Sequence, residues 1–300
     1  MPYIPPFSRS EKVDDYISMC KPVIWESVRI RSLDGTKLAL CIGHIPKHGA
    51  IDDTGQHIVI CYFQGNASSL PPRLPMLSSV LKLITDRQKT GTYPKIRYTM
   101  VALSYRGYWT SSGRASQTGI ELDAQALLEW VNDRYTSYGT NLQVILWGQS
   151  IGAGVASTAA AAYMRQITDS QQPPIAGIIL ETPFSNIRSM LSAIYPQKWL
   201  PYGYLWPFLW NHWDSERALQ RIAQDEKPPR ISLLSAEKDE IVPASEANKL
   251  ESLCRSKGLD VIRQDIAGAL HTAATLRRAG QDSVATFVVE TADSICSQDR

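Results

Sequence analysis

The chain has 300 residues, a hydrophobic fraction of 44% and a formal net charge of +2. That length allows one large α/β domain or two small ones, and the hydrophobic content is ordinary for a globular protein with a sizeable core. Charges of both signs are mixed along the chain. This argues against the concentrated basic surface of a nucleic-acid-binding protein, so we expect no nucleic-acid partner.

Cysteine usage and apolar runs bear on the cellular compartment. The five cysteines are scattered and form no C-x-x-C pair: Cys20, Cys41, Cys61, Cys254 and Cys296. This pattern is typical of reduced, mostly buried thiols in an intracellular protein. The sequence shows no apolar run long enough to span a membrane and no signal-peptide pattern at its start. We therefore expect a cytoplasmic protein, at most peripheral to a membrane.

The first half of the chain alternates strands and helices. Residues 1–22 are rich in proline, and we expect an N-terminal arm laid over the fold. Trp25–Arg31 alternates apolar and polar residues, and Asp34-Gly35 is a hairpin signal before the next strand. Further elements follow in chain order: strand Lys37–Ile45, strand Ile58–Phe63, helix Leu74–Asp86, strand Arg97–Tyr105 and helix Gly119–Tyr135.

The second half continues this alternation around one tight turn. An apolar strand over Leu142–Leu146 leads into Gly148–Gly152, and an alanine-rich helix follows to Ala161. Later elements are strand Ile175–Leu180, strand Arg230–Leu234, helix Ala244–Cys254, strand Asp260–Ile266 and helix Ser283–Cys296. Unbroken apolar strands alternating with helices predict an α/β fold with a mostly parallel central sheet and helices on both faces. We expect one domain over residues 23–300.

The segment 184–213 stands out as an insertion between two core strands. Beyond Phe184 it holds eight aromatic residues: Tyr195, Trp199, Tyr202, Tyr204, Trp206, Phe208, Trp210 and Trp213. One interpretation is a cap packed on the sheet with its aromatic side chains buried. The other is a lid whose aromatic face, over 195–213, contacts an acyl chain or a membrane surface, where Trp and Tyr are well accommodated.

The turn at residues 148–152 has the pattern G-x-S-x-G, with Ser150 at its centre. Between a strand and a helix this pattern predicts a nucleophile elbow, because so sharp a turn leaves no room for side chains two residues before and after the serine. The serine hydroxyl would lie at a helix N-terminus, where backbone N–H groups meet developing negative charge. We therefore predict Ser150 as a nucleophile.

A serine nucleophile needs a base, which in this architecture follows it in the chain. The histidines after Ser150 are His212, inside the aromatic insertion, and His271, directly past the last predicted strand. A mobile lid is a poor place for a general base. The carboxyl edge of a parallel sheet is where such sites form, so we predict His271.

The orienting acid is predicted in the loop after the strand Arg230–Leu234. That loop offers Glu237, Asp239 and Glu240, which spacing alone does not separate well. Asp239 is the first choice, with Glu240 and Glu237 as alternatives. Any of the three would accept the Nδ1–H of the base and stabilise its charged form.

Two backbone N–H groups are needed for the oxyanion. The first is predicted at Ile151, directly after the nucleophile. The second is predicted at Asn66 in the loop Gln64-Gly65-Asn66-Ala67, where Gly65 allows close approach of the backbone. Without the serine turn this loop would be read as an ordinary turn.

These motifs together resemble the α/β-hydrolase superfamily, and within it the ABHD-type serine hydrolases, which include acylglycerol lipases and protein depalmitoylases. The matching stretches are Phe63–Ala67, Tyr105–Tyr108, Gly148–Gly152, Glu181–Phe184, Asp239–Pro243 and His271. The resemblance implies an α/β-hydrolase fold with neither metal nor organic cofactor. It also favours Asp239, which stands four residues before a proline, as the family acid does.

The chain departs from this family at two positions. Gln64 stands where the family usually has a histidine. Because that histidine supports the oxyanion loop and does not transfer protons, we expect the chain to keep its activity at an altered level. Trp109 stands where a glycine is usual, and we expect it to narrow the mouth of the pocket.

The expected function is a serine hydrolase of the esterase or lipase type, acting on a carboxylic ester with an apolar acyl chain through an acyl-enzyme. A protein S-acyl thioesterase would use the same groups and is the first alternative. A non-catalytic binding module on the same fold is the alternative from another class. A small-molecule or lipid ester is the expected partner.

Overall fold

The computed structural model describes residues 8–46, 55–66, 69–89, 96–136, 141–166, 172–194 and 212–298. Within these residues eight strands form one sheet in the order β1-β2-β4-β3-β5-β6-β7-β8. The strands are β1 Ile24–Arg31, β2 Lys37–His44, β3 Gln56–Phe63, β4 Arg97–Ser104, β5 Asn141–Gln149, β6 Ile175–Glu181, β7 Arg230–Ala236 and β8 Val261–Ile266. Strands β1, β2 and β4 pair antiparallel, and all other pairs are parallel.

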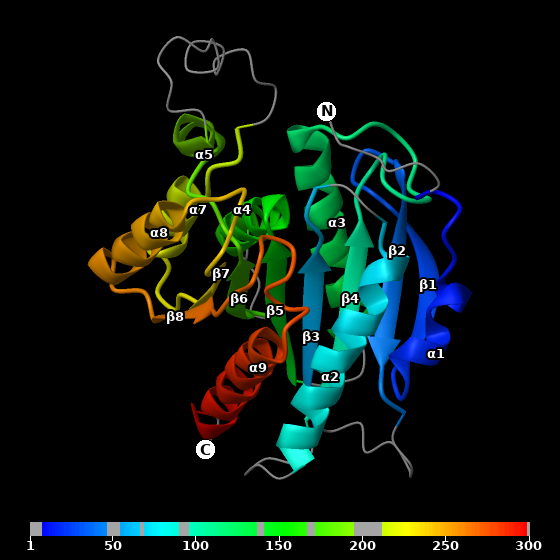
Figure 1. Cartoon of the computed structure of the whole chain (residues 1–300). Coiled ribbons are helices and arrows are strands. Elements are labelled where there is room, and N and C mark those ends of the chain that lie inside the picture. Colours follow the sequence, from blue (N-terminus) through cyan, green and yellow to red (C-terminus); the bar gives the residue numbers. More distant parts are fainter. Residues whose placement is uncertain are drawn as a thin grey trace.

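Helices cover both faces of this sheet (Figure 1). The α-helices are α1 Ile17–Cys20, α2 Leu74–Lys89, α3 Gln117–Tyr135, α4 Ile151–Gln166, α5 Ile187–Ile194, α7 Ser215–Ile222, α8 Ala244–Ser256 and α9 Arg278–Gln298. Short 3-10 turns occur at Val13–Asp15 and Pro71–Arg73. Helices α1, α2 and α9 pack on one face, and α3, α4, α7 and α8 pack on the other.

Strand β3 shows why the sheet is buried on both sides. Ile58 and Ile60 belong to the core on the α2 and α9 side, while Val59 and Cys61 belong to the core on the α3 and α4 side. Side chains alternate between faces along a strand, so an unbroken apolar run fits only a strand that is covered twice. The predicted α/β class and the mostly parallel sheet are confirmed.

The predicted elements are present with shifted ends. Gly35 has φ +84° at the predicted β1–β2 hairpin. Helix α3 begins two residues earlier than predicted, because the Ser116 side chain accepts a hydrogen bond from the Gly119 backbone N–H and caps it. Helix α9 begins at Arg278 instead of Ser283, and α7 (Ser215–Ile222) was absent from the predicted elements.

The carboxyl ends of the parallel strands lie at one edge of the sheet. There Phe63 of β3 is in register with Gly148 of β5, and Gln149 of β5 with Glu181 of β6. The loops that leave these ends, and those after β7 and β8, carry the candidate site.

Candidate active site

The turn between β5 and α4 has the geometry of a nucleophile elbow. Ser150 adopts φ +54°, a left-handed conformation that non-glycine residues rarely take. A Cβ atom on Gly148 would lie 2.0 Å from the Gly152 carbonyl oxygen, and one on Gly152 would lie 2.1 Å from the Phe63 carbonyl oxygen. Both glycines of the pattern are therefore sterically required. The turn is also held by the Ser150 backbone N–H, which donates to the Glu181 carbonyl oxygen at 2.8 Å.

His271 lies in the loop between β8 and α9 and is 3% exposed. Its Nε2 is 2.8 Å from the Ser150 Oγ. Its Nδ1 lies 2.8 Å from Oδ2 and 3.0 Å from Oδ1 of Asp239. Because a carboxylate only accepts, this arrangement places the proton on Nδ1 and leaves Nε2 free to accept the serine proton. The structure brings the predicted Ser150, His271 and Asp239 together.

The three carboxylates offered by the sequence have different partners. Asp239 faces the imidazole, and its Oδ1 also accepts the backbone N–H groups of Ile241 and Val242 at 2.9 and 2.7 Å. Glu240 accepts the backbone N–H of His271 at 2.9 Å. Glu237 accepts the backbone N–H of Gly268. Only Asp239 contacts the ring, while the two alternatives brace the backbone of the histidine loop.

The loop after β3 lies against the elbow. A Cβ atom on Gly65 would be 3.4 Å from the Gln149 carbonyl oxygen and 3.5 Å from the Ser150 Cβ, so the backbone of this loop lies in van der Waals reach of the nucleophile. Ile151 is the first residue of α4, directly after the serine. The predicted donors Asn66 and Ile151 thus lie on two segments that adjoin Ser150. Ala67 lies outside the described residues.

Two buried tyrosines hold this loop in place, and the sequence reasoning assigned them no role. The Tyr105 hydroxyl donates to the Gln64 carbonyl oxygen at 2.8 Å, and the Tyr108 hydroxyl donates to Asn66 Oδ1 at 2.8 Å. Both hydroxyls come from the turn that follows β4. That turn therefore fixes the side chain and backbone of the predicted oxyanion loop.

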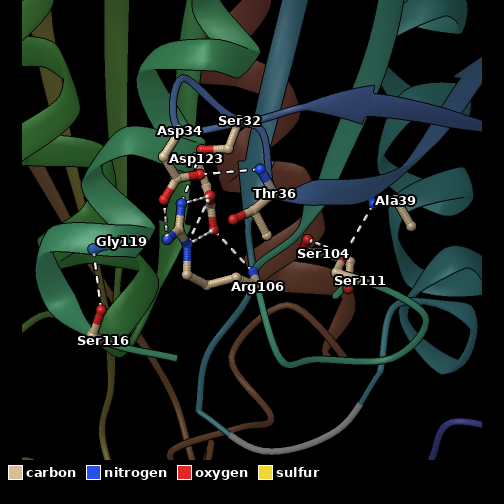
Figure 2. Close-up of polar contacts among 10 residues, drawn as sticks. All are labelled: Ser32, Asp34, Thr36, Ala39, Ser104, Arg106, Ser111, Ser116, Gly119 and Asp123. Atoms are coloured by element: carbon tan, nitrogen blue, oxygen red, sulfur yellow. Dashed lines mark hydrogen bonds and ion pairs between the residues drawn. The ribbon is translucent and has the colours of Figure 1, made fainter. Parts of the chain in front are cut away.

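The turn is itself anchored by Arg106, whose guanidinium lies between two carboxylates (Figure 2). Arg106 contacts Asp123 of α3 through Nε and Nη2, the latter at 2.7 Å, and its backbone N–H donates to the same carboxylate at 2.9 Å. Its Nη1 lies 2.7 Å from Asp34 of the β1–β2 hairpin, and its Nη2 donates to Ser32 Oγ at 3.0 Å. Hydrogen bonds from Arg106 and Thr36 hold the pKa of the Asp34 carboxyl well below its usual range.

No family model matches the chain, but proteins of known sequence do. It is 30% identical over 199 residues to protein bem46 of Schizosaccharomyces pombe, in an alignment that covers 66% of this chain and 56% of that protein. It is 33% identical over 211 residues to lysophosphatidylserine lipase ABHD12 of Danio rerio, in an alignment that covers 68% of this chain and 49% of that protein. The chain thus spans about half the length of the curated relatives it matches. It is an ABHD-type α/β-hydrolase.

Solved esterases are similar to this ABHD-type chain in fold. The esterase of Pyrobaculum calidifontis aligns with a TM-score of 0.64 and 17% identity, covering 96% of this chain and 91% of that one. The Pyrococcus furiosus esterase Pf2001 aligns with a TM-score of 0.62 and 16% identity, covering 93% of each chain. At these identities the likeness concerns the fold alone.

The structure locates both departures from the ABHD-type pattern. Gln64 is 1% exposed, and neither atom of its amide finds a hydrogen-bond partner among the described residues. Trp109 adopts φ +41° and is 5% exposed, and its indole N–H donates to the Glu11 carbonyl oxygen of the N-terminal segment at 2.9 Å. Trp109 therefore packs under residues of the arm.

Only the two ends of the predicted insertion belong to the described residues. Phe184 and Trp213 are buried, and Trp213 lies against Gly154 of α4. His212 is exposed, and its backbone N–H donates to the Gln117 side chain of α3. The other aromatic residues of the insertion lie outside the described residues: Tyr195, Trp199, Tyr202, Tyr204, Trp206, Phe208 and Trp210.

Two other kinds of feature are absent from the described residues. No group of His, Cys, Asp or Glu side chains in that part of the chain is arranged to hold a metal ion. Among the described helices, none combines the length and apolar character needed to cross a membrane.

Proposed function

We propose that this ABHD-type chain is a serine hydrolase that cleaves carboxylic esters with an apolar acyl chain. The observation that carries the proposal is the unbroken hydrogen-bonded series from Ser150 Oγ through the His271 ring to Asp239, with 2.8 Å at both ends of the imidazole. A serine hydroxyl activated by an oriented imidazole is the arrangement that acyl transfer requires.

In the proposed first step, Ser150 Oγ attacks the carbonyl carbon of the ester while His271 Nε2 takes the hydroxyl proton. The bond from that carbon to the leaving alcohol then breaks, and His271 returns the proton to the alcohol oxygen. In the second step, water attacks the acyl-enzyme, His271 takes a proton from the water, and the proton returns to Ser150 as the acid leaves. Asp239 holds the ring in the tautomer that both steps need.

The backbone N–H groups of Ile151 and Asn66 are proposed as donors to the oxyanion. The Ile151 N–H stands at the start of α4, a 16-residue helix whose dipole favours negative charge at that end. Loss of one such donor raises the barrier by about 3 kcal/mol. The loop of Asn66 lies beside Ser150, which supports its part in this role.

The substrate class is proposed from the relatives and from the aromatic insertion. The relatives of known name include lysophosphatidylserine lipases, so a lysophospholipid with one acyl ester is a reasonable first lipid substrate. The aromatic segment 195–213 is proposed to meet the acyl chain or a lipid surface. A cytoplasmic location stays a prediction.

Labelling with a fluorophosphonate probe tests the proposed nucleophile. Wild type should be labelled and Ser150→Ala should not. Ser157→Ala is the matched control, because Ser157 is a fully buried serine of α4, the helix that follows Ser150, and its hydroxyl donates to the Gly154 carbonyl oxygen at 3.1 Å. Absence of labelling in folded wild type would refute the hydrolase and favour a binding module.

Turnover of three substrate types tests the substrate class. They are p-nitrophenyl esters from acetate to palmitate, lysophosphatidylserine and a palmitoyl thioester. The proposal expects hydrolysis of the longer esters and of the lysophospholipid to exceed that of the thioester. A thioester hydrolysed faster than any oxygen ester would instead identify an S-acyl thioesterase.

A further inference from the structure

The mechanism leaves one fully buried carboxyl group unused, that of Glu181 at the end of β6. It has no exposed surface. Its oxygens accept from the Trp147 indole N–H at 3.0 Å and from the Gln149 side-chain amide at 3.2 Å. They also accept from Thr275, through the hydroxyl at 2.7 Å and the backbone N–H at 3.3 Å. Four donors therefore converge on one side chain.

These donors come from the two segments that carry the reacting pair. Trp147 and Gln149 lie on β5, directly before Ser150, while Thr275 lies four residues after His271. The Glu181 backbone contributes as well, since its carbonyl oxygen accepts the Ser150 N–H at 2.8 Å. The elbow and the histidine loop are far apart in the chain, and Glu181 forms hydrogen bonds with both.

A carboxyl group is a costly way to fill this space. Burial raises the pKa of the Glu181 carboxyl. Removing an ionised carboxylate from water costs several kcal/mol, and only well-placed hydrogen-bond donors offset that cost. These four hydrogen-bond donors are all neutral groups. Apolar packing would stabilise the core at least as well, so stability alone gives no reason for a carboxyl at this position.

Backbone strain is found at the same place. Gln149 and Glu181 are register partners on adjacent strands, and each precedes a strained residue, Ser150 at φ +54° and Thr182 at φ +45°. A β-branched residue at positive φ is a genuine outlier, and such strain persists only where surrounding contacts determine the backbone. The contacts of Glu181 supply such a constraint on both turns.

We infer that Glu181 is a positioning residue that holds the His271 loop in register with Ser150 through its hydrogen bond from the Thr275 hydroxyl. It does not contact the reacting atoms. The inference rests on the proposed hydrolase function. A displacement of about 1 Å between nucleophile and base is enough to slow such a reaction about a hundredfold, so a rigid tie between the two segments has a functional effect.

Substitutions at Thr275 test this with little disturbance, since Val and Thr have nearly the same shape. Thr275→Val removes the hydroxyl donor, and we expect kcat and the rate of fluorophosphonate labelling to fall about tenfold with KM unchanged, the effect of losing a hydrogen bond to a charged group. Thr275→Ser keeps the hydroxyl and should stay within about twofold of wild type.

Thr99→Val is the matched control. Thr99 is 5% exposed, its hydroxyl is bonded to His57 at 2.9 Å, and it lies near the start of β4, at the end of the sheet opposite the site. It should match Thr275→Val in its loss of thermal stability while keeping wild-type kcat. A Thr275→Val enzyme with wild-type kcat would overturn the inference, and so would a Thr275→Ser enzyme as slow as Thr275→Val.

A second pair of variants compares two buried carboxyl groups. Glu181→Gln keeps the shape but turns an amide NH2 toward N–H groups that only donate: the indole of Trp147 at one oxygen, or the Gln149 amide and the Thr275 backbone at the other. The matched variant is Glu246→Gln, because Glu246 is also fully buried and accepts from Ser185, Ser189 and Lys249, away from the elbow and the histidine loop. Only Glu181→Gln should reduce kcat beyond its effect on stability. Equal losses in the two variants would refute a positioning role.

A proton NMR measurement separates this inference from the proposed function. The proton between His271 Nδ1 and Asp239 should give a slowly exchanging low-field resonance in wild type that broadens or disappears in Thr275→Val and persists in Thr275→Ser. This readout requires no turnover. Unlabelled, inactive wild type with these spectra would refute the hydrolase alone, while identical spectra for wild type and Thr275→Val would refute the positioning role.

Discussion

The substitution Gly152→Ala tests the steric basis of the elbow. The added Cβ would lie 2.1 Å from the Phe63 carbonyl oxygen and 2.7 Å from that of Gln64, both of them backbone atoms. Carbon–oxygen contacts of this kind normally sit at about 3.3 Å or more. The start of α4 and the end of β3 would therefore have to separate by about 1 Å. That movement would displace the loop that carries Asn66 from Ser150.

The expected magnitudes follow from this overlap. Overpacking of a filled core costs about 1–3 kcal/mol, and contact with backbone on the far side favours the upper end of that range. The helix preference of Ala over Gly returns about 1 kcal/mol, so we expect a net loss of about 2 kcal/mol. For 300 residues, with about 2.1 cal/mol/K of unfolding entropy each, this lowers Tm by about 3 °C. Displacement of the oxyanion loop should slow ester hydrolysis about a hundredfold.

Gly154→Ala is the control from the same helix. Its Cβ would meet the Trp213 side chain at 3.1 Å, a contact relieved by a shift of a few tenths of an ångström. This variant should keep wild-type labelling and a Tm equal to or above that of wild type, because helix preference favours Ala. Calorimetry and the fluorophosphonate labelling rate are the assays. If Gly152→Ala were labelled at the wild-type rate, the close contact between Gly152 and the end of β3 would not be needed to hold the oxyanion loop beside Ser150.

Three further predictions concern the turn after β4 and its anchor. Tyr108→Phe removes the donor to Asn66 Oδ1 and should lower kcat about tenfold with unchanged KM; an unchanged kcat would show that Asn66 needs no such support. Asp123→Ala leaves the nearly buried Arg106 guanidinium without its main partner and should lower the unfolding free energy by about 3–5 kcal/mol in urea, whereas a loss below about 1 kcal/mol would contradict a strong buried pair. The folded-state pKa of Asp34 is depressed, so its contribution is present above its unfolded pKa of about 3.9 and declines below it. Urea titrations should therefore show the difference between wild type and Asp34→Asn shrinking steadily as the pH falls below about 4.5, with much of it still present at about pH 3, and a pH-independent difference would exclude this linkage.

The features predicted most directly from the sequence are those set by neighbouring residues. Gly148 is set by its own turn, because a Cβ there would meet the Gly152 carbonyl oxygen, whereas the exclusion at Gly152 comes from the backbone at the end of β3. The alternation of apolar strands with helices predicted the sheet, since period and burial are local properties. Helix α7 was missed although Asp214 caps it and Ala218, Leu219 and Ile222 bury one face. With eight residues, α7 is too short for this spacing to stand out from the aromatic run before it.

Choices among similar residues required the tertiary structure. Spacing could not rank Glu237, Asp239 and Glu240, because their loop carries all three within four positions. The structure separates them by their partners: the imidazole for Asp239, and backbone N–H groups of the histidine loop for the other two. Which carboxylate reaches the ring depends on where β8 ends relative to β7, a register that no local pattern states.

The supporting residues were beyond sequence reasoning for the same reason. Tyr108 bonds to a residue 42 positions earlier, and the Glu181 carboxyl meets a hydroxyl 94 positions later. A tyrosine after a strand or a glutamate ending one has many ordinary explanations when its partner is unknown. The resemblance pointed to both stretches without assigning either residue a role. Their function follows only from what the fold places against them.

The conformation of Ser150 joins the local and the tertiary contributions. By local preference a position at φ +54° would be filled by glycine, because a Cβ is unfavourable there. The serine is held by constraints from three strands: its own β5, the Phe63 carbonyl of β3 against Gly152, and the Glu181 carbonyl of β6 on its N–H. The pentapeptide pattern can therefore predict the turn only together with the strand before it and the helix after it, because those elements supply the neighbours that make the strained conformation stable.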